Sequence, residues 1–590
     1  MIDFIYISKF KDLLSPEHFA KHGAAVNFLS KEDQILAVTE KEDLGYGKYI
    51  SKNKDFVLIY GDLIPRLNSD KKGDPDLFSI SADELVKDYK GNYVILRSIN
   101  NDITLWSNPL ITKPVFYHIG SDNTIYISSN LTWIHKNIEK QKIHAASVIA
   151  IQAFDLIPGN RTLFEDVYIL KGGEEIKFNS GKINSRTYFD FSGFLKQKVM
   201  GEQESFDHLT SILRENMKRF LGSVKYTSSA LTGGFDGRLN FSTMLPEDRK
   251  KVLFYSYGRE GSMQLSIPAE ISEKLKVDYK GIPLDDEYEK DFAENSVEAL
   301  KLSDGFAPFM RANYLYSHKI ISKITNFLIT GIFGSEVMRP WHDLGGIQMS
   351  DKVREIFMSD DRKKAFDDVF DRMENEGYIL KEHYLEARKE LFKYLDDNYF
   401  QKHRDLPKPE TLFLLFFTEG ITKFFTQEIR VEKYYMTHFL PFIDLDFAEA
   451  ILRSPFLGLR NGFYENSAIK RRKGQRFYAM VMNKFCPEIS KIRTDRGYAP
   501  RSLITTIGWL DIIKGFIVYK KIKKYFTPDD TFNAAKWQFL FYKDREADVT
   551  EADSIFGDNI KTKWNEEAYL KDRYRFSRLV SIKYWYNKLI

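Results

Sequence analysis

The stretch SSALTGGFDGRLNFS, residues 228–242, has the composition of a loop that binds phosphate. Gly233 and Gly234 follow small and hydroxyl-bearing residues, and Asp236 comes two positions later. Glycines let a backbone approach phosphate without an intervening Cβ, and consecutive N–H groups that lead into a helix N-terminus attract anions. Asp236 is a candidate magnesium ligand, and Thr232 adds a hydroxyl donor. The alternative interpretation is a strand–helix turn whose glycines only permit tight packing.

The segments around this loop predict alternating strands and helices. A strand should precede the loop and a helix should follow it, and a second strand and helix are expected at 251–258 and 266–277. An amphipathic helix is predicted over 205–222, and a further strand and loop over 326–339. Strands that alternate with helices are typical of a parallel, doubly wound sheet. The rest of the second half is predicted to be mostly helical.

The N-terminal third has a different pattern. Runs of β-branched and aromatic residues, separated by Asn, Asp and Gly, favour antiparallel sheets. These runs lie at 55–64, 91–99, 102–106 and 123–128. The segment 135–144 is interpreted as a polar helix or connection, and the basic stretch YKKIKKYF at 519–526 as a solvated helix face.

Composition limits the classes of function. The chain has 590 residues and a formal net charge of +4, too small a charge for its size to indicate nucleic-acid binding. Its one cysteine, Cys486, excludes an internal disulfide framework and a cysteine-rich metal site. The longest apolar runs, such as LFLLFF at 412–417, are far too short to span a bilayer. We therefore expect a cytoplasmic protein without a membrane or nucleic-acid partner.

Several stretches together resemble the asparagine synthetase family. LTGGFDG resembles the pyrophosphate loop of N-type ATP pyrophosphatases, usually Ser-Gly-Gly-x-Asp-Ser, and three later stretches resemble successive motifs of the asparagine synthetase domain. Two upstream stretches resemble the class II glutamine amidotransferase domain of the same enzymes, and the end of the chain resembles their C-terminal helix. The three stretches that resemble the asparagine synthetase domain are 255–284, 328–339 and 438–456. The two that resemble the amidotransferase domain are 89–130 and 157–173, and the C-terminal stretch is 574–590.

The resemblance implies an α/β protein with two domains. An N-terminal Ntn-type αββα sandwich is expected over 1–195, and a doubly wound parallel-sheet ATP pyrophosphatase domain with many helices over 200–590. Family members activate a carboxylate as its acyl-AMP, release pyrophosphate and let an amine attack. By position, the resemblance implies Asp236 as the magnesium ligand. It implies that ATP is held around Ala230, Thr232, Gly233, Gly234, Tyr257, Thr330 and Gly331.

The glutaminase elements of the family are absent. Its nucleophile is a cysteine directly after the initiator methionine, and here that position is Ile2. The Asn-Gly pair that contributes to the family's oxyanion hole is replaced by Tyr60 and Gly61. We therefore expect no glutamine hydrolysis. Because an unused ammonia tunnel would leave destabilising cavities, we also expect a mostly apolar interface filled by Phe and Tyr side chains.

The synthetase motifs also depart from the family pattern. The final serine of the loop is Gly237, and Arg238 adds a cation beside it, where we expect it to bind phosphate. In GIFGSE, the first glutamate and the aspartate of the family are Ile332 and Ser335, so that Glu336 alone stays acidic and becomes a catalytic candidate.

A later motif of the family contains a lysine that this chain lacks. Asp495 stands where the family places a lysine near the acyl-AMP, and Arg493 or Arg496 is the candidate replacement cation. A guanidinium matches phosphate well but is a poor proton donor. We take Arg493 as the second catalytic candidate.

Two functions remain open. The first is an ATP- and Mg²⁺-dependent amide-forming ligase that uses ammonia or an amine from a source other than glutamine hydrolysis, as in the resembled beta-lactam synthetases and lasso-peptide cyclases. Its substrate would be a carboxylate-bearing small molecule or peptide, and a homodimer is an open alternative. The second is a non-catalytic homologue that acts as a binding or scaffold protein. A tRNA-thiolating pyrophosphatase is a distant third, which no cysteine pair supports.

Overall fold

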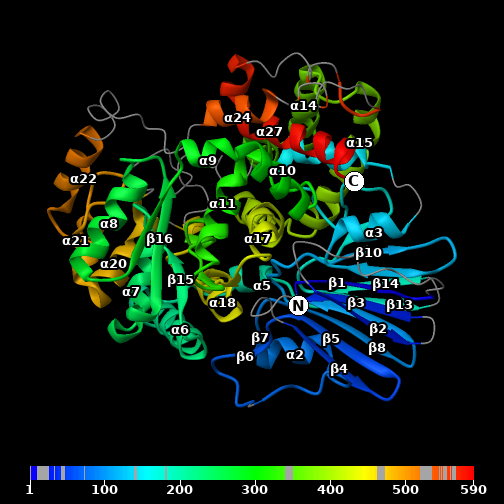
Figure 1. Ribbon diagram of the computed structural model, residues 1–590, viewed down its shortest axis with the longest axis horizontal. Coiled ribbons are helices and arrows are strands. Elements are labelled where there is room, and N and C mark those ends of the chain that lie inside the picture. Colours follow the sequence, from blue (N-terminus) through cyan, green and yellow to red (C-terminus); the bar gives the residue numbers. More distant parts are fainter. Residues whose placement is uncertain are drawn as a thin grey trace.

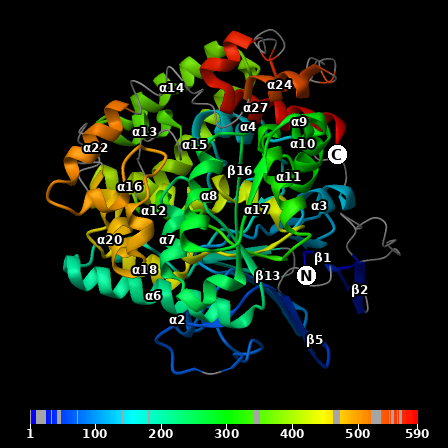
Figure 2. The same ribbon diagram turned by 60° about the vertical axis from the view of Figure 1, so that its left-hand side comes forward.

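A computed structural model gives the fold of the chain (Figure 1). It describes residues 2–9, 25–31, 34–40, 47–71, 73–138, 142–179, 182–338, 350–460, 472–518, 534–543, 545, 548, 554–557, 560 and 566–590. The basic stretch 519–526 and part of the segment 135–144 lie outside these residues. A β-rich N-terminal part adjoins a larger part in which helices surround a parallel sheet (Figures 1 and 2).

The N-terminal part contains two six-stranded antiparallel sheets. In spatial order, the first is β12 (Tyr168–Ile169), β10 (Phe116–Ile119), β11 (Ile125–Ser128), β1 (Asp3–Ile7), β3 (Gln34–Glu40) and β2 (Ala25–Lys31). The second is β14 (Lys182–Thr187), β13 (Glu174–Asn179), β9 (Asp102–Ser107), β8 (Tyr93–Ile99), β5 (Asp55–Gly61) and β4 (Gly47–Lys52). The predicted strands of this region are thus confirmed, with shifts of a few residues at their ends.

The two sheets are the inner layers of a four-layer arrangement, as the alternation of their side chains shows. Phe4 and Tyr6 of β1 pack with Phe56 and Leu58 of β5 in a buried cluster between the sheets. The intervening residues face outward, as the two-residue period of a strand requires. On the first sheet they pack against Trp133 of α3 (Leu131–Asn137), and on the second against residues of α2 (Ala82–Asp88). The order helix, sheet, sheet, helix is the expected αββα sandwich.

The larger part is built on a five-stranded parallel sheet. Its spatial order is β17 (Tyr279–Pro283), β16 (Val252–Gly258), β15 (Thr227–Ala230), β18 (Phe327–Ile329) and β19 (Thr437–Phe439). After β15, the chain adds β16 and β17 on one side of that strand, and it then adds β18 and β19 on the other side. The crevice between β15 and β18 is therefore a topological switch point, where ligands bind in open α/β sheets.

Helices cover both faces of this sheet. Phe254 packs with α6 (Glu202–Ser223), α7 (Asp236–Thr243) and α8 (Met263–Leu275), whereas its neighbours Leu253 and Tyr255 pack with α10 (Phe292–Leu302) and α11 (Ala312–Ile321). This is the predicted doubly wound arrangement. No helix among the described residues has both the length and the apolar character needed to cross a bilayer.

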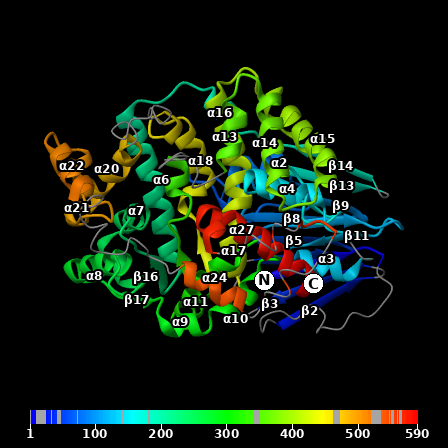
Figure 3. The ribbon, with the colours of Figure 1, turned by 90° about the horizontal axis from the view of Figure 1, so that it is seen from above.

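Apart from the four-residue α5 (Ser192–Leu195), the remaining α-helices are divided between the two halves of the molecule (Figure 3). They are α4 (Ala145–Phe154), α9 (Asp286–Lys290), α12 (Gly334–Met338), α13 (Asp351–Met358), α14 (Arg362–Glu376), α15 (Tyr384–Leu395), α16 (Lys408–Leu415), α17 (Thr426–Glu432), α18 (Leu445–Leu452), α20 (Arg476–Phe485), α21 (Pro487–Lys491), α22 (Gly508–Ile517), α24 (Ala534–Lys543) and α27 (Glu566–Lys588). The last of these is the helix expected at the C-terminal end of the chain.

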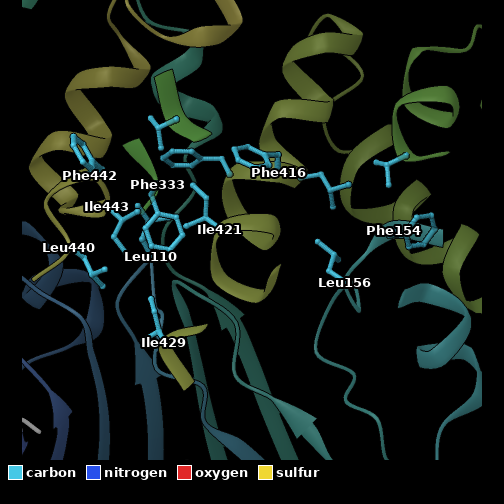
Figure 4. Close-up of a cluster of buried hydrophobic side chains, with 14 of the residues drawn as sticks. Leu110, Phe154, Leu156, Phe333, Phe416, Ile421, Ile429, Leu440, Phe442 and Ile443 are labelled. Atoms are coloured by element: carbon cyan, nitrogen blue, oxygen red, sulfur yellow. The ribbon is translucent and has the colours of Figure 1, made fainter. Parts of the chain in front are cut away.

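The two halves meet through aromatic packing and through buried charges. Figure 4 shows Leu110, Phe154 and Leu156 of the first half in one buried cluster with Phe333 and Phe416 of the second. This packing gives part of the aromatic filling that we expected, but a cavity of about 120 Å³ remains between the halves, lined by residues such as Pro114, Phe189 and Tyr399. The buried ion pairs at the same interface were not expected, so the description of the interface as mostly apolar is incomplete.

The charged contacts join residues that are far apart in the sequence. Fully buried Lys90 lies 2.7 Å from carboxylate oxygens of both Asp444 and Asp446. Asp3, also fully buried, accepts hydrogen bonds from Lys433 Nζ and Tyr434 OH, each at 2.5 Å. Burial alone would lower the pKa of Lys433, but the Asp3 carboxylate raises it above its ordinary value.

We predict that Asp3→Ala lowers the free energy of unfolding by about 3–5 kcal/mol, because it leaves the Lys433 ammonium buried without its partner. Urea unfolding, followed by circular dichroism, measures the change. The matched control is Asp70→Ala, which removes an exposed carboxylate and should change stability by less than about 0.5 kcal/mol. Equal unfolding midpoints for the two variants would contradict the importance of this contact.

Candidate functional site

A cavity of about 470 Å³ lies at the carboxyl ends of β15, β16 and β18, where the loops that leave these strands meet. This volume is within the range of small-molecule sites, about 300–1,000 Å³. The cavity lies at the switch point of the parallel sheet. Of the residues predicted to form the site, it brings together Ala230, Thr232, Asp236, Tyr257, Thr330, Gly331 and Glu336.

The glycine loop between β15 and α7 forms one wall. The Gly234 N–H donates to Thr232 Oγ1 at 3.2 Å, which closes the loop on itself. The N–H groups of the first turn of α7 have no acceptor within the helix, so this end of the cavity offers donors to an anion. A Cβ at Gly237 would lie 2.4 Å from the carbonyl oxygen of Ala230. The backbone therefore excludes the serine that is usual in the resembled loop.

The Asp236 carboxylate accepts a hydrogen bond on each of its two oxygens. Its Oδ2 accepts a hydrogen bond from Ser335 Oγ at 2.5 Å, and its Oδ1 accepts one from Tyr478 OH at 2.6 Å. These partners come from α12 and α20, 99 and 242 residues away in the sequence. Two hydroxyl donors fix the direction of the carboxylate.

The structure corrects the expectation for Arg238. Its guanidinium is fully buried beneath the loop, where it donates to the carbonyl oxygens of Ile492 and Arg493 at 2.7 Å and of Gly233 at 3.3 Å. Burial lowers its pKa to about 10, although nearby Asp495 acts in the opposite direction. Arg238 is thus a brace between two loops, and it does not line the cavity as a phosphate ligand.

Gly233, Gly234 and Arg493 also lie away from the cavity wall. A Cβ on Gly233 would lie 3.0 Å from Cβ of Asp495, so this glycine serves the packing of the two loops. The side chain of Arg493 is 58% exposed, donates to the carbonyl oxygen of Gly497 at 2.9 Å and lies 3.5 Å from Asp511. The structure therefore does not bring Arg493 together with Glu336.

Two helices supply charged residues at the other end of the cavity that the sequence analysis missed. Arg311, just before α11, lies 3.3 Å from Glu428 of α17, and its Nη1 donates to Tyr314 OH at 3.3 Å. Burial raises the pKa of Glu428 to about 7, although Arg311 opposes this shift. The cavity thus contains a carboxyl group that titrates near neutral pH.

A second buried group lies beside it. The Glu432 carboxylate is 2.7 Å from His438 Nε2 and 3.5 Å from His318 Nε2, and Tyr255 OH lies 3.4 Å from His318. Burial lowers the pKa of His318. Burial alone would raise the pKa of Glu432, but the two histidines lower it overall. The Glu432 carboxylate is therefore kept ionised deep in the protein.

Helical spacing was the signal available for these residues. Glu428 and Glu432 are four positions apart, so they lie on one face of α17. Arg311, Tyr314 and His318 have spacings of three and four residues, which again place them on one face. Such spacing is also common in solvent-exposed helices, and only the structure shows that both faces meet the end of the glycine loop.

The nucleophile region of the N-terminal half contains a much smaller cavity. About 30 Å³ is available between Ile2, Tyr60, Asp62 and Lys113, which is room for one or two water molecules. Tyr60 OH donates to the carbonyl oxygen of Ile2 at 3.0 Å and closes this space. The position of the family's nucleophile is thus occupied by the buried, apolar Ile2.

Comparison with known proteins does not establish a family. No protein-family model matches the chain, and no curated protein is similar to it. Among solved structures, it is similar to the glutamine phosphoribosylpyrophosphate amidotransferase from B. subtilis complexed with ADP and GMP, with 9% identity and a TM-score of 0.20 over 47% of this chain and 65% of that one. It is also similar to a structure of the allosteric regulatory enzyme of purine biosynthesis, with 7% identity and a TM-score of 0.19 over 47% of this chain and 58% of the other. Each match spans less than two thirds of the solved chain, and scores this low establish neither fold nor function.

We predict that Glu428 makes stability depend on pH. Its folded-state pKa of about 7 lies above its ordinary value of 4.5, so the folded protein binds this proton more tightly. The resulting stabilisation is present at low pH and is lost as the pH rises from about 4.5 to about 7. The wild type loses this stabilisation between about pH 5 and about pH 8, whereas Glu428→Gln does not. Over this interval the free energy of unfolding of Glu428→Gln should therefore rise by about 1–3 kcal/mol relative to that of the wild type.

Chemical unfolding at the two pH values measures this difference. The control is Glu294→Gln on α10, because Glu294 is exposed. A Glu428→Gln difference that is the same at both pH values would show that this carboxyl titrates normally.

Proposed function

We propose that the chain is an asparagine-synthetase-like, ATP-dependent amide-forming ligase whose amine does not come from glutamine. One observation carries the proposal: six of the predicted nucleotide residues line one cavity at the switch point of a doubly wound parallel sheet, and Thr232 and Asp236 of the glycine loop are among them. This is where such sheets bind ligands, whatever their sequence.

The lining of the cavity supports a nucleotide at its loop end. Thr232 and the first turn of α7 offer donors to phosphate, and Gly331 lets the β18 loop approach without a side chain. Tyr257 provides an aromatic surface on the adjacent strand. In this proposal ATP activates the substrate carboxylate by adenylation with release of pyrophosphate, and an amine then displaces AMP to form the amide.

Asp236 and Ser335 would hold the magnesium ion that accompanies ATP. Within the described ranges, no group of three or more His, Cys, Asp or Glu side chains is placed to hold a metal by itself. Magnesium bound to a nucleotide does not need such a group, since phosphate oxygens and water complete its shell. A carboxylate beside a hydroxyl is a donor pair that nucleotide-binding proteins use for this ion. When bound, the ion would neutralise phosphate charge.

The charged end of the cavity suits the other substrates. Arg311 can pair with a carboxylate, and Glu428, with its pKa near neutrality, can accept a proton from an attacking amine. Glu336 lines the same space and keeps the role of a catalytic candidate. These residues agree with a substrate that carries a carboxylate and with an amine as its partner.

A non-catalytic binding protein is the second candidate, and a specific observation favours it. Arg238 is committed to backbone carbonyls, and Asp495 stands beside the loop where the resembled enzymes have a lysine. The phosphate end thus has fewer cations than adenylation chemistry ordinarily uses. A homologue that keeps the cavity but not the reaction would have this arrangement.

We predict that the wild type binds a non-hydrolysable ATP analogue in the presence of magnesium, measured by calorimetry. Asp236→Asn should weaken this binding by about tenfold or more and remove the effect of magnesium, because charge-assisted contacts contribute about 1.5–3 kcal/mol. Gly234→Val should abolish binding. A Cβ at Gly234 meets only Thr232 Oγ1, at 3.4 Å, so the fold should tolerate the change while the loop is obstructed.

The matched control is Gly222→Val on α6, where an added Cβ meets no atom within 4 Å. It should bind nucleotide as the wild type does. If the wild type binds no nucleotide at about millimolar concentration, the ligase proposal fails. If it binds, exchange of labelled pyrophosphate into ATP with candidate carboxylates separates the ligase from the non-catalytic protein.

We also predict that the purified protein releases no glutamate from glutamine. Ile2 stands where the resembled enzymes have their nucleophile, and Tyr60, in place of an oxyanion-hole residue, donates a hydrogen bond to the carbonyl oxygen of Ile2. Glutamate release is compared with that of a heat-inactivated sample. Release above that control, and sensitive to an alkylating glutamine analogue, would overturn the prediction.

A further inference from the structure

Helix α22 (Gly508–Ile517) presents an apolar face to solvent. Ile507 is 73% exposed and Trp509 is 56% exposed, and four more large apolar side chains follow within nine residues: Leu510, Ile513, Ile517 and Val518. Elsewhere in the described part of the chain, exposed large apolar side chains are dispersed over separate elements. Dispersed apolar residues need no explanation, whereas a contiguous patch marks a surface that another body covers.

The opposite face of the helix is held firmly to the protein. Gly508, Asp511, Ile512 and Gly515 recur at the spacing of one helix face. Asp511 accepts hydrogen bonds from Ser502 Oγ at 2.6 Å and from the Ala499 N–H at 3.2 Å. Ile512 is buried.

Close backbone contacts fix α22 further. A Cβ at Gly508 would lie 1.9 Å from the carbonyl oxygen of Ser502, and one at Gly515 would lie 2.6 Å from that of Gly497. The helix therefore cannot rotate to bury Trp509 or Ile513. The apolar face is a fixed feature of the surface.

The position of α22 leaves this face accessible. The helix lies at the outer edge of the molecule, on the side away from the N-terminal sandwich (Figures 1 and 3). It remains at the edge when the molecule is turned (Figure 2).

Positive charge surrounds the apolar face. Lys491, Arg501 and Lys514 are exposed on or next to this lobe, where Glu488 is an exposed acid and Asp511 lies 3.5 Å from Arg493. An apolar helix face with a tryptophan and with lysines at its border is the composition of helices that lie at the surface of anionic membranes.

We propose that α22 is a docking face for an anionic phospholipid membrane. Its apolar side chains would enter the region between headgroups and acyl chains, and the bordering lysines and arginines would pair with headgroup phosphates. A helix of ten residues is far too short to span the bilayer, so the contact is peripheral. A second copy of the chain is a poorer occupant, because pairing two such faces would bring like charges together.

The test is flotation of the full chain with vesicles. The wild type should float with vesicles of phosphatidylcholine and phosphatidylglycerol, bind at least about tenfold less to phosphatidylcholine alone, and dissociate as salt is raised. Trp509→Ser combined with Ile513→Ser should lose at least about tenfold in binding. The matched control is Phe539→Ser on α24, where a 62% exposed aromatic side chain lies outside this face, and it should float normally.

A spectroscopic measurement places the contact without depending on that double variant. Lipids with a spin label in the upper acyl chain should quench tryptophan fluorescence of the wild type, and Trp509→Phe should float but lose this quenching. The proposal is overturned if the wild type does not bind anionic vesicles, or if Phe539→Ser loses as much binding as the double variant. It is also overturned if sedimentation shows a dimer that the double variant disrupts while vesicles bind neither protein.

Discussion

The site depends on the close approach of two loops at one point of the parallel sheet. An added Cβ would lie 3.0 Å from Cβ of Asp236 at Gly331, 2.8 Å from its Oδ1 at Gly334, and 2.4 Å from a backbone oxygen at Gly237. Only residues without a Cβ permit these contacts. Because the loops after β15 and β18 can meet, Asp236 reaches both Ser335 and Tyr478, and the cavity opens directly beside it.

Helix α17 connects this site to the N-terminal sandwich. Glu428 and Glu432 form the charged end of the cavity, and the next residue, Lys433, binds the buried Asp3 of β1. The sandwich thus fixes the position of a helix that supplies polar groups to the cavity in the other half. This gives the sandwich a structural role even if it catalyses nothing. Its own small cavity, closed by Tyr60, agrees with such a role.

Burial changes the character of several charged groups. Arg238 is removed from solvent and holds three carbonyl oxygens, so a residue type suited to phosphate instead joins two loops. Glu428 has only a partial counter-charge in Arg311 and its pKa rises, whereas Glu432 lies between two histidines and its pKa falls. Two glutamates on one short helix thereby acquire opposite protonation behaviour from their surroundings.

Local sequence was sufficient for the architecture and for the loop end of the site. Runs of β-branched and aromatic residues gave the antiparallel strands, helical spacing gave α6 and α8, and the glycine pair located the turn beside which the cavity lies. These features depend on neighbouring residues. The direction of Arg238, the charged cavity end and the ion pairs of Asp3 and Lys90 depend on residues more than a hundred positions apart. The same is true of α22: its sequence is apolar apart from Asp511 and Lys514, and packing against residues 497–502 decides that the face with Asp511 is buried while Trp509 and Ile513 meet solvent. The sequence by itself therefore determined the elements and their order, while the tertiary structure decided which side chains meet, because periodicity specifies the faces of an element but not the partner of each face.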